Sequence, residues 1–159
     1  MFRSRRKEVC RWLADQQVDM AFITKDADVR YLTGMPYGSV LILLARGKSI
    51  LLPWDVILAS KIADADEIIP YTDYSRDVQS AVAKIAEREN LKDGARIEIP
   101  GDVTHLSFGG FEEALSKYSV VCRPDGISGH IKKLRMIKDA TELAILRKAC
   151  TLTNALMGE

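Results

Sequence analysis

The segment that decides the fold is residues 131–149, which read IKKLRMIKDATELAILRKA. It predicts a short strand that leads into a helix. Asp139 can cap this helix, and Glu142, three residues later, can reach back to the N–H of the cap. Further along, apolar side chains recur at helical spacing and form one stripe: Leu143, Leu146, Cys150 and Met157. A helix with such a stripe needs a partner surface, so we expect it to open a second structural unit.

This reading divides the chain into two parts. Residues 1–129 are expected to form an N-terminal α/β domain. Residues 130–159 are expected to hold a linker and the first helix of a second unit. The length of 159 residues suits one domain with a substantial hydrophobic core.

The composition excludes several classes of function. Hydrophobic residues make up 47% and charged residues 28% of the chain, as in an ordinary globular protein. A formal net charge of +1 gives no electrostatic reason to expect nucleic acid as a partner. The longest apolar run, residues 40–45, is too short to span a membrane. We therefore expect no nucleic acid and no membrane among the partners.

The three cysteines, Cys10, Cys122 and Cys150, are widely spaced and odd in number. This pattern favours reduced, mostly buried thiols, which are typical of a cytoplasmic protein. The N-terminus has a basic start but no unbroken apolar stretch behind it, so no targeting signal is predicted.

Working outward from residues 131–149, helical and strand patterns alternate along the chain. Helices are predicted over residues 2–17, 26–32, 54–63, 74–90 and 104–117, the second capped by Asp26. Strands are predicted over residues 19–24, 40–45, 49–52, 67–70, 96–99 and 119–123, and residues 124–129 read as a linker-like turn. Gly47 sits in the turn of a predicted hairpin. This order predicts an α/β fold with a mixed sheet of about six strands and helices on both faces.

Motifs that carry chemistry are hard to find in this chain. The sequence has no H-E-x-x-H, C-x-x-C or G-x-S-x-G pattern. Its two histidines, His105 and His130, are far apart, and for both we expect a surface or capping role. No set of carboxylates has the spacing of metal ligands, so neither catalytic nor metal-binding residues are predicted.

Residues 29–38, VRYLTGMPYG, form a loop of a different kind, rich in aromatic residues, glycine and proline. Tyr31 and Leu32 suit a core, and Gly34 suits a turn. Met35 and Tyr37 flank Pro36, and a tip that contains proline tends to lie at the surface. We therefore expect Met35 and Tyr37 at an interface or at the lip of a pocket.

Two motifs together give the chain a family resemblance. The first is VxYLTG over residues 29–34, and the second is LRxIKDxxELxxLRxA over residues 134–149. Two shorter matches, LLxWD over residues 51–55 and IPYTD over residues 69–73, lie between them in the same order. In these motifs the chain resembles the N-terminal domain of the creatinase/prolidase/aminopeptidase P family, the pita-bread metallopeptidases.

The resemblance implies that residues 1–129 are the non-catalytic, mixed α/β N-terminal domain of an Xaa-Pro metallopeptidase. It also implies that residues 130–159 hold the linker and first helix of a C-terminal catalytic domain that the chain itself lacks. That catalytic domain would bind two divalent metal ions, such as Mn, through Asp, Asp, His, Glu and Glu, and no position of this chain matches one of those ligands. The implied partners are the chain's own C-terminal catalytic domain, a second subunit in a homodimer, and a peptide substrate.

The resemblance also suggests where this domain takes part in function. In the family, residues of the N-terminal domain can close the rim of a neighbouring subunit's active site. The residues expected there are Met35 and Tyr37, with Trp54 and Asp55 as second candidates. For Trp54 and Asp55, a core tryptophan and a helix cap are the simpler interpretations.

Three alternatives remain open from the sequence. The parent protein could be a catalytically inactive or repurposed family member in which this domain is a binding module. It could be a creatinase-like amidinohydrolase. Outside the family, the chain could be a stand-alone small α/β ligand-binding domain.

Overall fold

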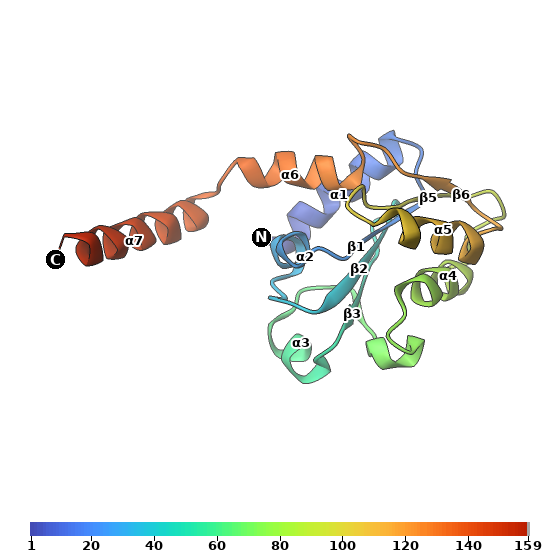
Figure 1. Cartoon of the computed structure of the whole chain (residues 1–159), viewed down its shortest axis with the longest axis horizontal. Helices are drawn as coiled ribbons and strands as arrows, with labels where there is room; N and C mark the ends of the chain where they lie inside the picture. Colours follow the sequence, from blue (N-terminus) through green and yellow to red (C-terminus); the bar gives the residue numbers. More distant parts are fainter. Residues whose placement is uncertain (159) are drawn as a thin grey trace.

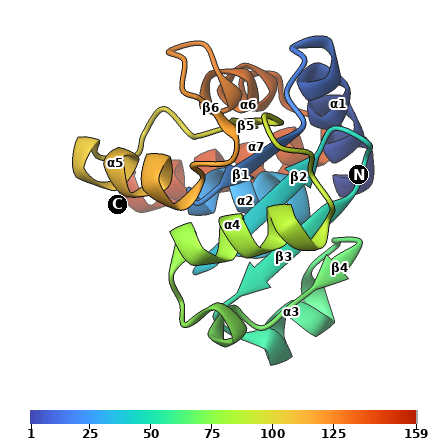
Figure 2. The same cartoon turned by 90° about the vertical axis from the view of Figure 1, so that its right-hand side faces the viewer.

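The computed structural model describes residues 1–158 and shows a six-stranded mixed sheet with helices on both faces (Figures 1 and 2), as predicted. The strands are β1 (Met20–Ile23), β2 (Ser39–Leu44), β3 (Ser49–Pro53), β4 (Glu67–Ile68), β5 (Arg96–Glu98) and β6 (Ser119–Val121). The helices are α1 (Phe2–Asp15), α2 (Asp26–Thr33), α3 (Val56–Ile62), α4 (Val78–Arg88), α5 (His105–Ala114), α6 (Ile127–Met136) and α7 (Ala140–Met157), with a 3-10 helix at Tyr71–Tyr74.

The strands lie in the order β4-β3-β2-β1-β5-β6. Only β2 runs against the others: it is antiparallel to β1 and β3, whereas the β3–β4, β1–β5 and β5–β6 pairs are parallel. The predicted hairpin is confirmed as β2–β3, and Gly47 takes a φ of +97° in its turn. Five strands therefore point their carboxyl ends to the same edge of the sheet.

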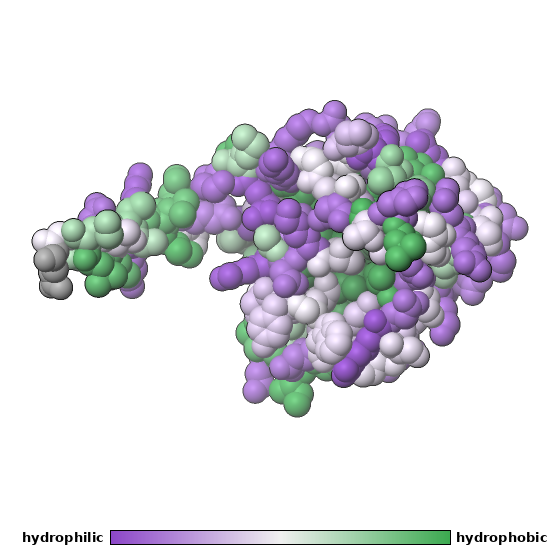
Figure 3. All heavy atoms as spheres, viewed as in Figure 1, coloured by the Kyte–Doolittle hydropathy of each residue, from purple (hydrophilic) through white to green (hydrophobic). Residues whose placement is uncertain are grey.

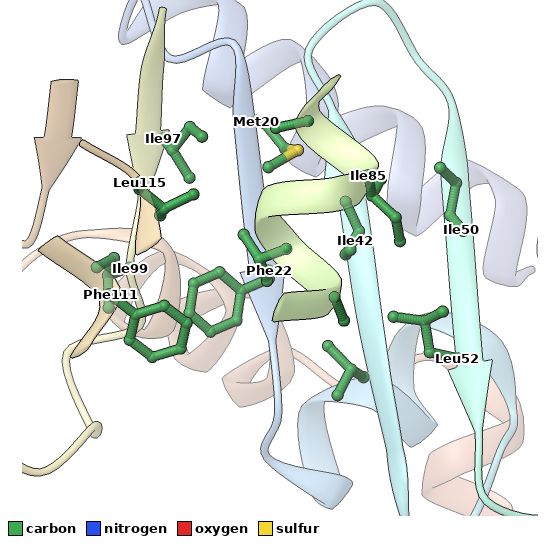
Figure 4. Packing of buried hydrophobic residues seen from close by; sticks show 14 of the residues in the cluster. Met20, Phe22, Ile42, Ile50, Leu52, Ile85, Ile97, Ile99, Phe111 and Leu115 are labelled. Carbon is green, nitrogen blue, oxygen red and sulfur yellow. The ribbon is translucent and has the colours of Figure 1, made fainter. Parts of the chain in front are cut away.

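Side chains of successive strand residues face opposite sides and build two cores. In the first core, Met20 and Phe22 of β1 pack under α4 and α5, and the rings of Phe22 and Phe111 lie 4.7 Å apart (Figure 4). In the second core, on the opposite face, Ala21 and Ile23 pack under α1, α2, α3 and α6. Because both faces are covered, the strands read as continuous apolar runs rather than as alternating ones.

The main difference from prediction is α6. The strand expected near residue 131 is wrong, and so is the turn expected up to residue 129, because a helix begins at Ile127 and runs across both. Ile127, Ile131 and Leu134 recur at helical spacing, and Ile127 and Ile131 are completely buried in the second core. This stripe is the signal that sequence reading missed.

Two smaller corrections concern helix starts. Lys25 is the N-cap of α2, so the predicted cap by Asp26 is wrong; the Asp26 carboxylate accepts a hydrogen bond from the Gly38 N–H at 2.9 Å instead. The helix predicted over residues 74–90 begins at Val78, because Ser75 and Arg76 adopt left-handed φ angles of 55° and 56° and Asp77 caps α4.

One buried carboxylate holds α6 against the sheet. Glu98, at the end of β5, has no exposed surface. Its oxygens accept hydrogen bonds from the Ile127 N–H at 3.1 Å and from the Arg123 guanidinium at 2.6 Å. A Cβ on Gly126 would lie only 2.0 Å from Glu98 Oε1, so residue 126 must be a glycine for this contact to form.

We expect Gly126→Ala to destabilise the domain by about 2–4 kcal/mol, because the added methyl group displaces a buried hydrogen-bonded carboxylate. Gly109→Ala in α5 is the matched control, since a Cβ there meets nothing within 4 Å and alanine favours a helix by up to about 1 kcal/mol. Urea unfolding followed by circular dichroism measures both. Equal stability of the Gly126→Ala variant and the wild type would contradict the role given to Glu98.

Candidate functional site

The loop that follows α2 turns sharply and buries its first side chain. Gly34 ends α2 with a left-handed φ of +84°. The Thr33 hydroxyl donates to the Val29 carbonyl at 2.8 Å and accepts the Met35 N–H at 3.1 Å. Met35 is thereby drawn into the second core, where its side chain is completely buried. The expectation that Met35 lies at the surface is wrong, because the local bonds of Thr33 outweigh the influence of the neighbouring proline.

Tyr37 and Trp54 lie on the two chain segments that meet at the carboxyl edge of the sheet. The Trp54 N–H donates to the Gly38 carbonyl at 2.9 Å, which extends the β2–β3 ladder by one bond. A Cβ on Gly38 would touch the indole of Trp54 at 3.4 Å. Tyr37 is 54% exposed and Trp54 is 52% exposed. Trp54 is therefore not a core residue, and the placement of Tyr37 at an interface or pocket rim stays a prediction.

Trp54 is half-exposed but not free to move. Its ring meets Tyr71 edge-on at a centroid distance of 6.3 Å, and the guanidinium of Arg76 stacks over it at 4.2 Å. Asp55 accepts the Leu58 N–H at 2.8 Å and caps α3, so the interpretation of Asp55 as a helix cap is confirmed. A fixed indole with one open face is suited to contact another apolar or aromatic group.

We call Tyr37, Trp54, Val56 and Ile57 the aromatic surface. Val56 and Ile57 begin α3 directly after the cap, and Ile57 is 72% exposed. Exposed rings and aliphatic side chains at this end of the β2–β3 hairpin favour contact with another protein or with a ligand. Arg76 adds a cation that can pair with an acidic group of that partner.

The second sequence motif supplies ion pairs that fix the start of α7. Arg135 pairs with the buried Asp28 at 2.6 Å. Arg5 reaches both members of the predicted capping box, Asp139 at 2.6 Å and Glu142 at 3.1 Å, and the box itself is confirmed. The Glu142 N–H and the Arg5 guanidinium lower the pKa of Asp139, which favours the charged carboxylate at neutral pH.

The first motif meets the second at Arg5. The Arg5 guanidinium lies 3.9 Å from the centroid of the Tyr31 ring and donates to the Tyr31 carbonyl at 3.0 Å. Burial raises the pKa of Tyr31 despite this nearby positive charge. Residues separated by more than a hundred positions are therefore joined through one arginine.

The cysteines and histidines agree only in part with the sequence-based expectations. Cys10 is buried, and burial raises its pKa to about 11, but Cys122 and Cys150 are exposed, so the expectation of mostly buried thiols is wrong. His105 is exposed at the start of α5, whereas His130 is half-buried and stacked on Trp12 at 4.6 Å. A purely surface role for His130 is therefore wrong, and burial lowers its pKa.

Within residues 1–158, no group of three or more His, Cys, Asp or Glu side chains could hold a metal ion. No helix in the same range is long and apolar enough to cross a membrane.

Comparison with known proteins identifies the family. The model of the creatinase/prolidase N-terminal domain matches residues 5–137, so the chain belongs to this family. The matched range includes α6 and ends just before the capping box of α7. A search of curated proteins found no match.

Solved structures share the fold at low sequence identity. A prolidase from Pyrococcus furiosus superposes with a TM-score of 0.73 at 20% identity, over 94% of this chain and 43% of the prolidase. The N-terminal domain of the cytoplasmic peptidase PepQ from Mycobacterium tuberculosis gives a TM-score of 0.63 at 19% identity, over 79% of this chain and 97% of that domain. An Xaa-Pro aminopeptidase from Streptococcus thermophilus gives 0.65 at 16% identity, over 82% and 98% of the two chains. This chain thus spans less than half of the archaeal prolidase.

The contrast between Met35 and Tyr37 gives a direct test of the site. We expect Tyr37→Ala to change the free energy of unfolding of this chain by less than about 1 kcal/mol, because the side chain is mostly in solvent. Met35→Ala should cost about 2–5 kcal/mol, because it leaves a cavity in the second core. Urea unfolding of the two variants measures the difference. Similar losses for both would mean that Tyr37 is a structural residue.

Proposed function

We propose that this chain is the non-catalytic N-terminal domain of a cytoplasmic Xaa-Pro metallopeptidase of the aminopeptidase P or prolidase type. In this proposal α7 is the first helix of the catalytic domain. Two divalent metal ions, such as Mn, belong to that domain, where they would activate the water that attacks a peptide bond next to proline. The domain described here contributes dimer contacts and shapes access to the substrate.

The observation that carries the proposal is α7. This helix has 18 residues, none of them buried, and it projects from the body (Figure 1). Large apolar side chains are exposed along it, most of all Ile145, Leu156 and Met157. Figure 3 shows hydrophobic patches along the projecting arm. Exposed apolar side chains on a helix that is fixed at its start favour docking to a further domain.

The aromatic surface is the best-supported place for contact with a second subunit and its substrate. Tyr37 offers a ring and a hydroxyl group, which suits a site that must grip and orient a short peptide. Arg76 and Tyr71 already restrict the Trp54 side chain, so its ring can contact a partner with little further loss of side-chain entropy. Met35 is buried in the second core and does not take part in this surface.

The 159-residue chain alone should hydrolyse no Xaa-Pro peptide and retain no stoichiometric metal after dialysis. The reason is that the ligand set of the proposal lies in the catalytic domain. Metal analysis by mass spectrometry, together with a proline-peptide assay in Mn²⁺, checks both statements. Turnover with tightly bound Mn, Co or Zn would show that the catalytic groups have been assigned to the wrong domain.

In the longer protein, Tyr37→Ala should lower kcat/KM for an Xaa-Pro dipeptide by about tenfold, the equivalent of one lost ring contact or hydrogen bond. Metal content and the melting temperature should not change. Leu106→Ala is the matched control, since Leu106 is 89% exposed on α5, away from the aromatic surface. Unchanged kinetics for Tyr37→Ala, or an equal loss for Leu106→Ala, would leave this domain as a scaffold only.

A further inference from the structure

A second feature lies at the same edge of the sheet as the aromatic surface. A cleft of about 520 Å³ opens between the start of α2, the loop after β5 and the exposed side of α6. Lys25, Gly101 and Pro124 line it, and each follows a different parallel strand, β1, β5 and β6. Its volume is within the range of pockets that hold small molecules.

The position of the cleft follows from the topology of the sheet. β1 and β5 are adjacent and parallel, but the helices that follow them cover opposite faces: α2 packs in the second core and α5 in the first. The two connections therefore diverge and leave a crevice beyond the carboxyl ends of the strands. In open α/β sheets this is the place where ligands bind.

The charge of the cleft selects for one kind of ligand. The charged residues that line the cleft are four cations and two carboxylates: Lys25, Lys132, Arg135 and Lys138, and Asp28 and Asp102. Arg135 and Asp28 neutralise one another at 2.6 Å. Neither Lys25 nor Lys132 forms an ion pair with any carboxylate in residues 1–158. The view in Figure 3 shows hydrophilic residues gathered where α7 meets the body.

The arrangement differs from an ordinary solvated surface in two respects. Arg135 is partly buried and held in place by Asp28, which itself is almost fully buried, so one wall of the cleft is rigid. Gly101 and Gly129 also line the cleft, so two positions of its wall carry no side chain. A fixed wall and free ammonium groups together favour a compact, multiply charged anion.

We propose that this cleft binds a small polyanion that carries phosphate or carboxylate groups, with Lys25 and Lys132 as its principal charged contacts. The site is separate from the aromatic surface and does not depend on the proposed peptidase function. Met136 and Lys138 also line the cleft and lead into α7. A bound anion would therefore touch both the body of the domain and the segment that carries the projecting helix.

The test uses the ¹⁵N-labelled 159-residue chain, titrated with pyrophosphate in one arm and citrate in the other. We expect saturating shifts of the amide signals of Lys25, Gly101 and Gly129 in at least one arm. The arm that saturates identifies the anion: pyrophosphate alone indicates a phosphate compound, citrate alone a polycarboxylate, and both indicate recognition of charge. Raising the salt concentration should weaken the binding, because the contacts are partly exposed.

The variant Lys25→Gln/Lys132→Gln should weaken binding by about tenfold or more, as expected for the loss of charged hydrogen bonds. Both lysines are exposed, so the variant should fold as the wild type does, and thermal unfolding checks this. Lys7→Gln/Lys84→Gln is the control with the same change in charge on two other exposed lysines.

The proposal is overturned if neither anion gives saturating shifts at the cleft. It is also overturned if the control pair weakens binding as much as Lys25→Gln/Lys132→Gln does, because the anions would then respond to net charge rather than to a site.

Discussion

The contact between Glu98 and the start of α6 is the constraint on which the C-terminal half of the structure depends. A carboxylate without exposed surface needs partners for its oxygens, and Arg123 and the Ile127 N–H supply them. The amino end of a helix also favours a negative charge. Because Gly126 leaves room for the carboxylate, α6 is seated at the end of β5 rather than continuing away from the sheet.

After the start of α6, ion pairs fix the path of the chain. The face of α6 that carries Ile131 enters the second core, and Arg135 on the same helix pairs with Asp28 of α2. Arg5 of α1 then holds Asp139 and Glu142 at the first turn of α7. The direction in which α7 leaves the body is thus set by ion pairs to two other helices, while its own apolar side chains remain exposed. Figure 1 shows the result as an arm on a layered body.

Local patterns in the sequence were sufficient where neighbours in the chain decide the structure. The β2–β3 hairpin, the left-handed end of α2 at Gly34 and the capping box of α7 all depend on residues within a few positions of one another. Sequence reading failed where distant residues decide. Trp54 is half-exposed and contacts Tyr71 and Arg76, which are distant from it in the sequence.

The candidate site shows the same division. The exposed position of Tyr37 could be predicted from its place beside a proline, but the burial of Met35 could not, since it depends on how the turn meets the second core. Nothing local to Lys25, Gly101 or Lys132 indicates a shared cleft, because these residues come together only through the order of the strands. Topology therefore brings together a cleft that no motif in this sequence indicates.

The most direct test of this account is amide hydrogen exchange across α6 and α7. In a dilute solution of the 159-residue chain, Ile131 should be protected as part of the core, whereas residues 143–157 should exchange rapidly, because an isolated helix of this length is only marginally stable. In the two-domain protein that we propose, the same α7 amides should become strongly protected. Strong protection of α7 in the dilute monomeric chain would contradict the claim that this helix is presented for docking to a further domain.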